Sequence, residues 1–364
     1  MSHTECGIVG LPNVGKSGLF NALTGAGIAS CNYPFCTIDP NVGIVSVKDE
    51  RLSRLASISN SEKIVYADVK FVDIAGLVKG AASGEGLGNK FLSHVRETHA
   101  IAHVVRCFEN TEITHVAGKI DPEDDIATIN LELILSDFSS AQSIYGKAEK
   151  AAKGKKEPGA LLFVLEKVLK HLESEQPVRT LELSDIEREV LKPYPFLTKK
   201  PILYVANIDE DSLGELSNEY VEKVKKIASE ERAPVIPICV RLEEELSALP
   251  KEEANELLLS LGLKESGLTR LVRSTYDALG LISYFTTGPI ETRAWTISRG
   301  TKAPDAAAAI HTDISKGFIR AEVVSMEDMI TYGGRSGARE NGKLRAEGRD
   351  YIVQDGDVVL FLHN

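Results

Sequence analysis

Residues 10–17 have the types and spacing of a loop that binds phosphate groups. They are Gly-Leu-Pro-Asn-Val-Gly-Lys-Ser, between a short apolar run and a segment with helical spacing. Glycines let successive backbone N–H groups converge on phosphate oxygens, and the following helix adds the positive end of its dipole. Lys16 is expected to neutralise the β and γ phosphates, and Ser17 to offer its hydroxyl to Mg²⁺. The predicted nucleotide contacts in this loop are Asn13, Val14, Gly15, Lys16, Ser17 and Gly18.

Two further segments could respond to a γ-phosphate. Asp73-Ile-Ala-Gly76 matches D-x-x-G at the end of a predicted strand, about sixty residues after the phosphate loop. Asp73 is expected to hold Mg²⁺ through water, and the N–H of Gly76 to reach the γ-phosphate. Thr37, in a loop marked by prolines, is expected to close over Mg²⁺ when the γ-phosphate is present. An ordinary loop threonine is the alternative for Thr37.

Leu77 follows Gly76 where regulatory GTPases usually carry a glutamine that orients the attacking water. Leucine cannot orient water. Another group must therefore position the water, or the intrinsic rate of hydrolysis is very low.

The base pocket departs from the guanine-reading pattern N-K-x-D. After an apolar run the chain has Asn207-Ile208-Asp209-Glu210, so isoleucine replaces lysine and glutamate replaces aspartate. The extra methylene of Glu210 displaces the carboxylate, and sites built on hydrogen bonds discriminate steeply. Ile208 would offer an apolar face to a purine. These residues favour ATP over GTP, although a shifted register with Asp209 as the guanine reader stays open.

Strands alternating with helices must position these loops. The pattern predicts an α/β fold with a parallel sheet covered by helices on both faces. A first helix is expected over 17–24 from its apolar spacing. The predicted strands are Cys6–Val9, Val65–Asp73, Ala102–Phe108, Ile202–Asn207 and Val235–Cys239.

Two later regions have a different character. Apolar residues at helical spacing near 126–133 and 161–172 predict two long antiparallel helices, joined by a Lys-rich hinge at 146–159 and inserted between two sheet strands. From about residue 279 the pattern predicts a small α+β domain. Its expected elements are a helix over 301–311 and strands over 295–297, 318–324, 351–353 and 358–362.

Composition limits the classes of function. The chain has 364 residues, which suits two or three domains, and its net charge of −11 argues against wholesale coating of nucleic acid. Its five cysteines are scattered without the spacing of a zinc site, so we interpret them as reduced thiols. No signal peptide and no apolar run long enough to span a membrane is found, so a cytosolic protein is expected.

Five stretches together resemble the YchF family of Obg-related P-loop NTPases, and the length indicates a bacterial member. They are residues 7–17, 32–41, 73–81, 104–110 and 345–357. The resemblance covers essentially the whole chain. It implies an OBG-type G domain over 1–128 and 200–278, a helical coiled-coil insertion over 129–199 and a C-terminal TGS (β-grasp) domain over 279–364.

The resemblance also implies an activity. It implies slow hydrolysis of ATP in preference to GTP, association with the ribosome, and a nucleotide-dependent switch in translation or the stress response. The family's water-positioning histidine matches His115. One departure is Gly18, where the family usually has threonine, and the N–H of Gly18 should still reach the α-phosphate. Asn13 resembles an asparagine that holds K⁺ in some related GTPases, although it could simply shape a turn.

Two basic clusters could contact RNA phosphates. The hinge cluster is Lys147, Lys150, Lys153, Lys155 and Lys156, and the C-terminal cluster is Arg335, Arg339, Lys343, Arg345 and Arg349. Lysines that keep a loop tip solvated are the alternative for the hinge. Two other functions stay open for the whole chain: a conventional GTP-binding regulator, and a nucleotide sensor that has lost hydrolysis.

Overall fold

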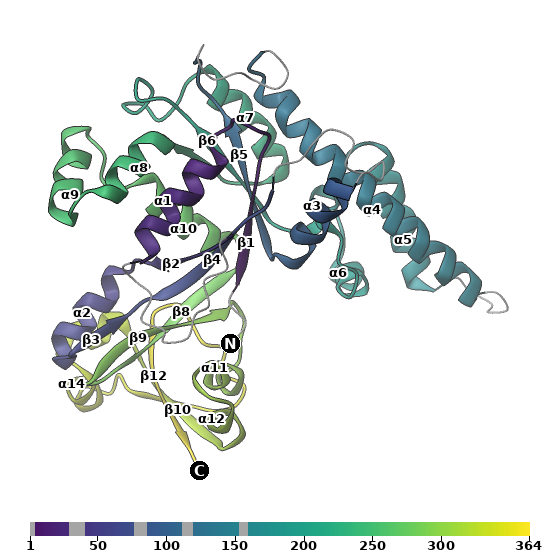
Figure 1. Cartoon of the computed structure of the whole chain (residues 1–364). Helices are drawn as coiled ribbons and strands as arrows, with labels where there is room; N and C mark the ends of the chain where they lie inside the picture. The colour runs from purple at the N-terminus through teal and green to yellow at the C-terminus, as the bar shows by residue number, and fades with distance from the viewer. Residues whose placement is uncertain (1–3, 29–40, 76–85, 111–118, 153–158) are drawn as a thin grey trace. The chain divides into compact units, whose positions relative to one another are not determined.

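The computed structural model describes residues 4–28, 41–75, 86–110, 119–152 and 159–364 (Figure 1). Its first sheet has six strands in the order β2-β4-β1-β5-β6-β7. These strands are β1 (Glu5–Val9), β2 (Val42–Val47), β4 (Ala67–Asp73), β5 (Ala100–Arg106), β6 (Ile202–Asn207) and β7 (Val235–Ile238). The pairs β1–β4, β1–β5, β5–β6 and β6–β7 are all parallel. The predicted α/β fold is therefore confirmed.

The central strands of this sheet are buried because helices cover them. Every residue of β5 and β6 is buried, as expected for apolar strands inside a parallel sheet. The helices of this region are α1 (Lys16–Ile28), α3 (Gly86–Glu97), α7 (Glu219–Glu231), α8 (Val240–Ala248), α9 (Lys251–Ser260) and α10 (Gly267–Ala278). Helices α1 and α8 lie side by side (Figure 1).

The predicted helical insertion between two sheet strands is confirmed. Helix α4 (Pro122–Ala152) follows β5, and α5 (Ala160–Glu173) packs against it before the chain reaches β6. The chain then forms η2 (Val178–Thr180), α6 (Asp185–Leu191) and η3 (Leu197–Lys199). Asp137 of α4 accepts hydrogen bonds from the backbone N–H groups of Leu197 and Thr198, both at 2.7 Å. This buried carboxylate fixes the segment that feeds β6.

The second sheet is mixed and has the order β11-β10-β12-β8-β9-β3. Its strands are β3 (Lys63–Val65), β8 (Leu281–Thr287), β9 (Glu291–Ser298), β10 (Phe318–Ser325), β11 (Arg345–Glu347) and β12 (Asp357–His363). The pairs β8–β9 and β10–β12 are antiparallel, whereas β12 and β8 are parallel. Helix α11 (Ala303–Ile310) places its alanine face in the core of this sheet. The other helices are α2 (Glu50–Ser59), α12 (Thr312–Lys316), α13 (Met326–Thr331) and α14 (Arg335–Glu340).

Two predicted strands differ from the structure. The single strand expected over 65–73 is divided, because β3 pairs with β9 of the second sheet while β4 pairs with β1 of the first. The strand expected over 351–353 is only an isolated bridge between Lys302 and Ile352. There the chain bends toward Asp357, which accepts hydrogen bonds from the hydroxyl of Tyr351 and the N–H of Gln354.

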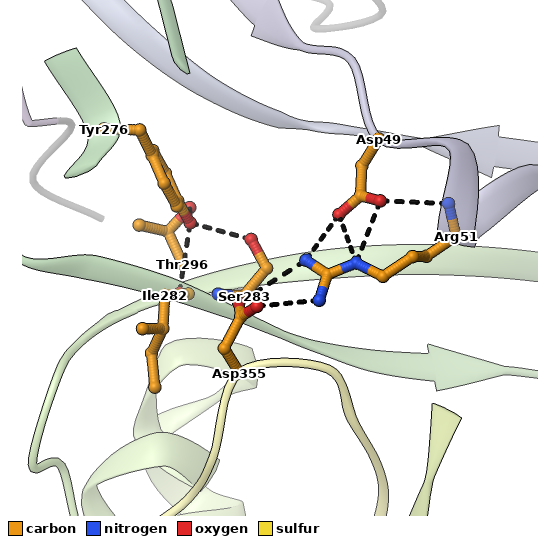
Figure 2. Close-up of polar contacts among 7 residues, drawn as sticks. All are labelled: Asp49, Arg51, Tyr276, Ile282, Ser283, Thr296 and Asp355. Carbon is orange, nitrogen blue, oxygen red and sulfur yellow. Dashed lines mark hydrogen bonds and ion pairs between the residues drawn. The ribbon is translucent and has the colours of Figure 1, made fainter. Parts of the chain in front are cut away.

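The described residues form two compact units, one with residues 44–69 and 272–364 and the other with 4–43 and 70–271. Figure 2 shows the polar centre of the first unit. Arg51 pairs with Asp49 and with Asp355, 304 positions away, and Asp355 accepts a hydrogen bond from the N–H of Ser283 at 2.9 Å. An early segment of the chain is therefore part of the C-terminal unit. The predicted three-domain boundaries stay a prediction.

Candidate functional site

The phosphate loop leaves β1 and enters α1 at Lys16, as its motif predicts. Two residues of the loop have left-handed backbone, Asn13 at φ 64° and Gly15 at φ 97°. A Cβ added at Gly15 would lie 2.2 Å from the side-chain nitrogen of Asn207, and one at Gly10 would lie 2.9 Å from the carbonyl oxygen of Val104. Both motif glycines are therefore required by close contacts. The φ of Asn13 supports the interpretation that this residue shapes a turn.

Lys16 and Asp73 come together at the end of this loop. The Lys16 ammonium contacts Oδ1 of Asp73, and the side chains are 12% and 20% exposed. The pairing of β1 with β4 brings them together, because Ile8 lies opposite Asp73 in the register. The N–H of Asp73 donates to the carbonyl of Asn41 at 2.9 Å, which fixes the strand end. The predicted phosphate-binding lysine and the predicted Mg²⁺ aspartate thus lie in one place.

Asn207 connects the end of β6 to the phosphate loop. Its side-chain nitrogen donates to the carbonyl of Val14 at 2.9 Å, and its side-chain oxygen accepts from the N–H of Val240 at 3.2 Å. The residue is 5% exposed. Both ends of the amide are thus bonded to backbone groups of the protein, so Asn207 holds the phosphate loop in place.

The next three residues differ sharply in exposure. Ile208 is 2% exposed, so the structure gives it little surface to present to a purine. Asp209 accepts from the N–H of Ser212 at 3.1 Å and from its hydroxyl at 2.6 Å, which closes a local turn. Glu210 is 54% exposed and lies 3.4 Å from Nε of Arg241. This arrangement favours Glu210 over Asp209 as the base-facing carboxylate.

Ser17 and Gly18 form the first turn of α1. Ser17 is exposed, so its hydroxyl is accessible. A Cβ added at Gly18 would lie 2.8 Å from Cγ1 of Val240 and 2.9 Å from Oε1 of Glu244. The glycine that departs from the usual family residue therefore lets α8 pack close to the phosphate loop.

Four residues named above, Thr37, Gly76, Leu77 and His115, lie outside the described residues. The segment that leads to His115 is described up to residue 110. Buried Arg106 donates to the carbonyls of Phe108 and Asn110 at 3.2 and 3.0 Å, and burial lowers the pKa of this arginine. Asn218 also donates to the carbonyl of Cys107 at 2.8 Å. The base of this segment is therefore held by several hydrogen bonds.

The oxygens present fit Mg²⁺. Ser17 and Asp73 offer a hydroxyl and a carboxylate, the hard donors that Mg²⁺ prefers. Within the described parts of the chain, no group of three or more His, Cys, Asp or Glu residues is placed to hold a metal ion. A phosphate site needs no such cluster, because Mg²⁺ usually takes one or two carboxylates and completes its shell with phosphate oxygens and water.

Comparison with known proteins covers the whole chain. Residues 5–138 match a family described as a 50S ribosome-binding GTPase, and residues 281–364 match the YchF-GTPase C-terminal family, described as a protein of unknown function. The chain is 55% identical to the "Ribosome-binding ATPase YchF" of Haemophilus influenzae over 99% of both chains. It is 52% identical to the Bacillus subtilis protein of that name over 98% of both chains. The chain belongs to the YchF family.

Solved structures agree with the YchF assignment. The Schizosaccharomyces pombe YchF GTPase is 38% identical and superposes with a TM-score of 0.89, over 100% of this chain and 98% of that one. A GTP-binding protein from Pyrococcus horikoshii, 21% identical with a TM-score of 0.61, covers 99% of this chain and 100% of its own, and shares the fold. No helix among the described residues is long and apolar enough to cross a membrane.

The C-terminal basic cluster of this YchF chain is largely paired with acidic groups. Arg335 and Arg339 both lie against Glu322, at 2.5 and 3.3 Å, and Arg335 is the main cause of the lowered pKa of that carboxyl. Arg345 lies 3.4 Å from Asp357 and Lys343 lies 3.9 Å from Asp328. The cluster therefore presents less positive charge than its sequence suggests. In the hinge cluster, only Lys147 and Lys150 lie within the described residues.

Sequence reasoning missed Val240 and Arg241. Val240 starts α8, separated from the end of β7 by one residue, and its N–H donates a hydrogen bond to Asn207. One signal could have found the connection between β7 and α8. In open α/β sheets ligands bind outside the carboxyl ends of the strands, and this connection follows the carboxyl end of β7.

Proposed function

We propose that this chain is a ribosome-associated P-loop ATPase that binds ATP with Mg²⁺ and hydrolyses it slowly, with weaker activity on GTP. It would act as a nucleotide-dependent switch in translation or the stress response. The observation that carries the proposal is the meeting of Lys16 and Asp73 at the start of α1, beside a loop that Asn207 holds in place. The names of the bacterial relatives, each a ribosome-binding ATPase, support it.

Lys16 and the N–H groups of residues 13–18 would bind the phosphates, and Ser17 and Asp73 would hold the metal ion. When bound, Mg²⁺ would neutralise charge that develops on the β and γ phosphates. Thr37 and Gly76 would respond to the γ-phosphate. His115 would position the attacking water, because Leu77 cannot. Binding of K⁺ at Asn13 stays a prediction that rests on the resemblance alone.

Turnover by His115→Ala tests the proposed water-positioning role. Hydrolysis of ATP should fall well below the wild-type rate while ATP binding is retained, and Lys16→Ala provides the baseline for lost phosphate binding. Equal rates for His115→Ala and wild type would remove His115 from the mechanism.

A conventional GTP-binding regulator is the second candidate. The S. pombe relative is titled a GTPase, and the family matched by residues 5–138 is described as a GTPase. Against this, Glu210 holds the position where guanine readers carry aspartate. Titration with non-hydrolysable ATP and GTP analogues separates the two, because the proposal expects ATP to bind at least tenfold more tightly. Equal or tighter GTP binding would favour the regulator.

Ribosome contact through the helical insertion and the C-terminal domain is part of the proposal. Because the C-terminal cluster is largely paired within the protein, neutralising it would also disturb its own fold. The hinge cluster should therefore be neutralised first, followed by all ten positions, with co-sedimentation on purified ribosomes as the measurement. Binding that persists after all ten changes would count against a role for these residues.

A further inference from the structure

An ion pair joins the loop that follows β6 to the first turn of α8, the helix that follows β7. Nε of Arg241, in the first turn of α8, lies 3.4 Å from Oε1 of Glu210, at the end of the Asn207–Glu210 segment. The side chains are 77% and 54% exposed, so a ligand can reach both. Glu245, one turn along α8, lies 3.8 Å from the same guanidinium nitrogen.

This pair stands beside the phosphate loop. The N–H of Val240, the residue before Arg241, donates to Asn207, which in turn donates to Val14. Added Cβ atoms at Gly15 and Gly18 would lie 3.6 and 2.8 Å from the methyl groups of Val240. The turn that carries Arg241 therefore packs directly on the loop and helix start that would hold the phosphates.

The Glu210 side chain is exposed at this place, beside the guanidinium of Arg241. A free carboxylate can accept two hydrogen bonds side by side, and guanine offers two adjacent donors at N1 and N2, whereas adenine does not. The guanidinium of Arg241, 3.4 Å from one Glu210 oxygen, offsets part of the carboxylate's charge and competes for that oxygen.

We propose that Arg241 is a positioning residue for base selectivity: its guanidinium competes with the two guanine donors for the Glu210 carboxylate and so disfavours GTP relative to ATP. The inference rests on the proposed function, because it takes Glu210 as the base-facing carboxylate. The guanidinium acts through Glu210 and needs no contact of its own with the base.

The test measures dissociation constants of ATP, GTP and ITP analogues for wild type and Arg241→Ala. Because exposed ion pairs are weak, the ratio of the GTP constant to the ATP constant should fall by about fivefold in the variant. ITP lacks the 2-amino group of GTP, so the substitution should tighten ITP binding less than it tightens GTP binding. Arg241→Lys, which keeps a cation, should retain most of the wild-type ratio.

Two variants serve as controls. Glu245→Ala removes the other partner of Arg241 and should leave the ratio unchanged. Adding Glu210→Ala to Arg241→Ala should cancel the gain in GTP binding, because the freed carboxylate is gone. A ratio within twofold of wild type in Arg241→Ala, a shift toward ATP, or a gain that ITP shares in full would each overturn the inference.

These outcomes are separate from failure of the proposed function. A wild-type protein that prefers GTP would contradict the proposed ATPase. The shift between wild type and Arg241→Ala is judged on its own, whichever nucleotide the wild type prefers.

Discussion

Lys16 and Asp73 give a prediction at the scale of single residues. Asp73→Asn keeps the shape of the side chain but removes the charge that would hold Mg²⁺ and that pairs with Lys16. Hydrolysis of ATP at saturating Mg²⁺ should fall by about 100-fold, as expected when one charge-stabilising group is lost. Steady-state phosphate release measures it.

The same variant should also lose most of the tightening of ATP binding that Mg²⁺ provides. Asp124→Asn, an exposed change on α4, is the matched control and should keep the wild-type rate. A rate for Asp73→Asn above half that of wild type would show that Asp73 does not hold the metal.

His103 gives a second residue-scale prediction, which concerns pH. This histidine of β5 is fully buried beside the ring of Tyr204, and neither ring nitrogen has a hydrogen-bond partner among the described residues. Burial lowers its pKa to about 3. The unfolded chain therefore binds a proton that the folded chain does not, so stability is lost as pH falls below about 6.5.

Urea unfolding at pH 7 and pH 5 measures how much the unfolding free energy depends on this protonation. His103 should contribute about 2 kcal/mol to the loss of unfolding free energy between these values. His103→Leu should remove that contribution, and at pH 7 should be neutral or stabilising because two unsatisfied nitrogens are replaced by apolar atoms. His94→Gln, an exposed change on α3, should leave the loss in place. An unchanged loss in His103→Leu would contradict the prediction.

At the scale of elements, α1 contains a matched pair of glycines. Gly25→Ala meets only ordinary contacts, the nearest being Oγ of Ser247 at 3.4 Å, so it should stabilise the protein by about 1 kcal/mol through helix propensity. Gly18→Ala would press on Val240 at 2.8 Å and should destabilise by about 1 kcal/mol instead. Denaturant unfolding without nucleotide compares them. Stabilisation by both changes would mean that α8 has room to retreat from α1.

Elements with local signals could be predicted from the sequence. The phosphate loop, the strand Ile202–Asn207 and the helix near 303–310 follow from glycine spacing and apolar periodicity within a few residues. The break at Tyr66 could not be predicted, because the residue pattern typical of a strand continues across it. Only the choice of partner strand divides the segment into β3 and β4. The contact between Glu210 and Arg241 was equally hidden, since it depends on a loop after β6 and a helix start after β7 that the sheet brings together.

At the scale of the whole molecule, Arg51 joins the early segment to the C-terminal residues. It is bonded to Asp49 and Asp355 (Figure 2). Its guanidinium also lies over the ring of Phe285, 5.0 Å from the centroid. Arg51→Ala should lower the unfolding free energy of this unit by about 1–2 kcal/mol, because charge-assisted hydrogen bonds are lost. The chain has one tryptophan, Trp295 of β9, so its fluorescence reports on this unit.

Arg54→Ala, an exposed change on the same helix, should stay within about 0.5 kcal/mol of wild type. An equal effect of the two changes would mean that Arg51 contributes no more than a surface arginine.

The division of one extended segment between β3 and β4 affects the order in which the chain can fold during synthesis. Ser61, just before β3, donates a hydrogen bond to the carbonyl of Gly288, 227 residues later. At bacterial elongation rates of about 5–20 residues per second, β3 would wait on the order of ten seconds or more for β9. The nascent chain would meanwhile carry an unpaired strand edge, which makes this segment the place where chaperone binding or misassembly during translation is expected.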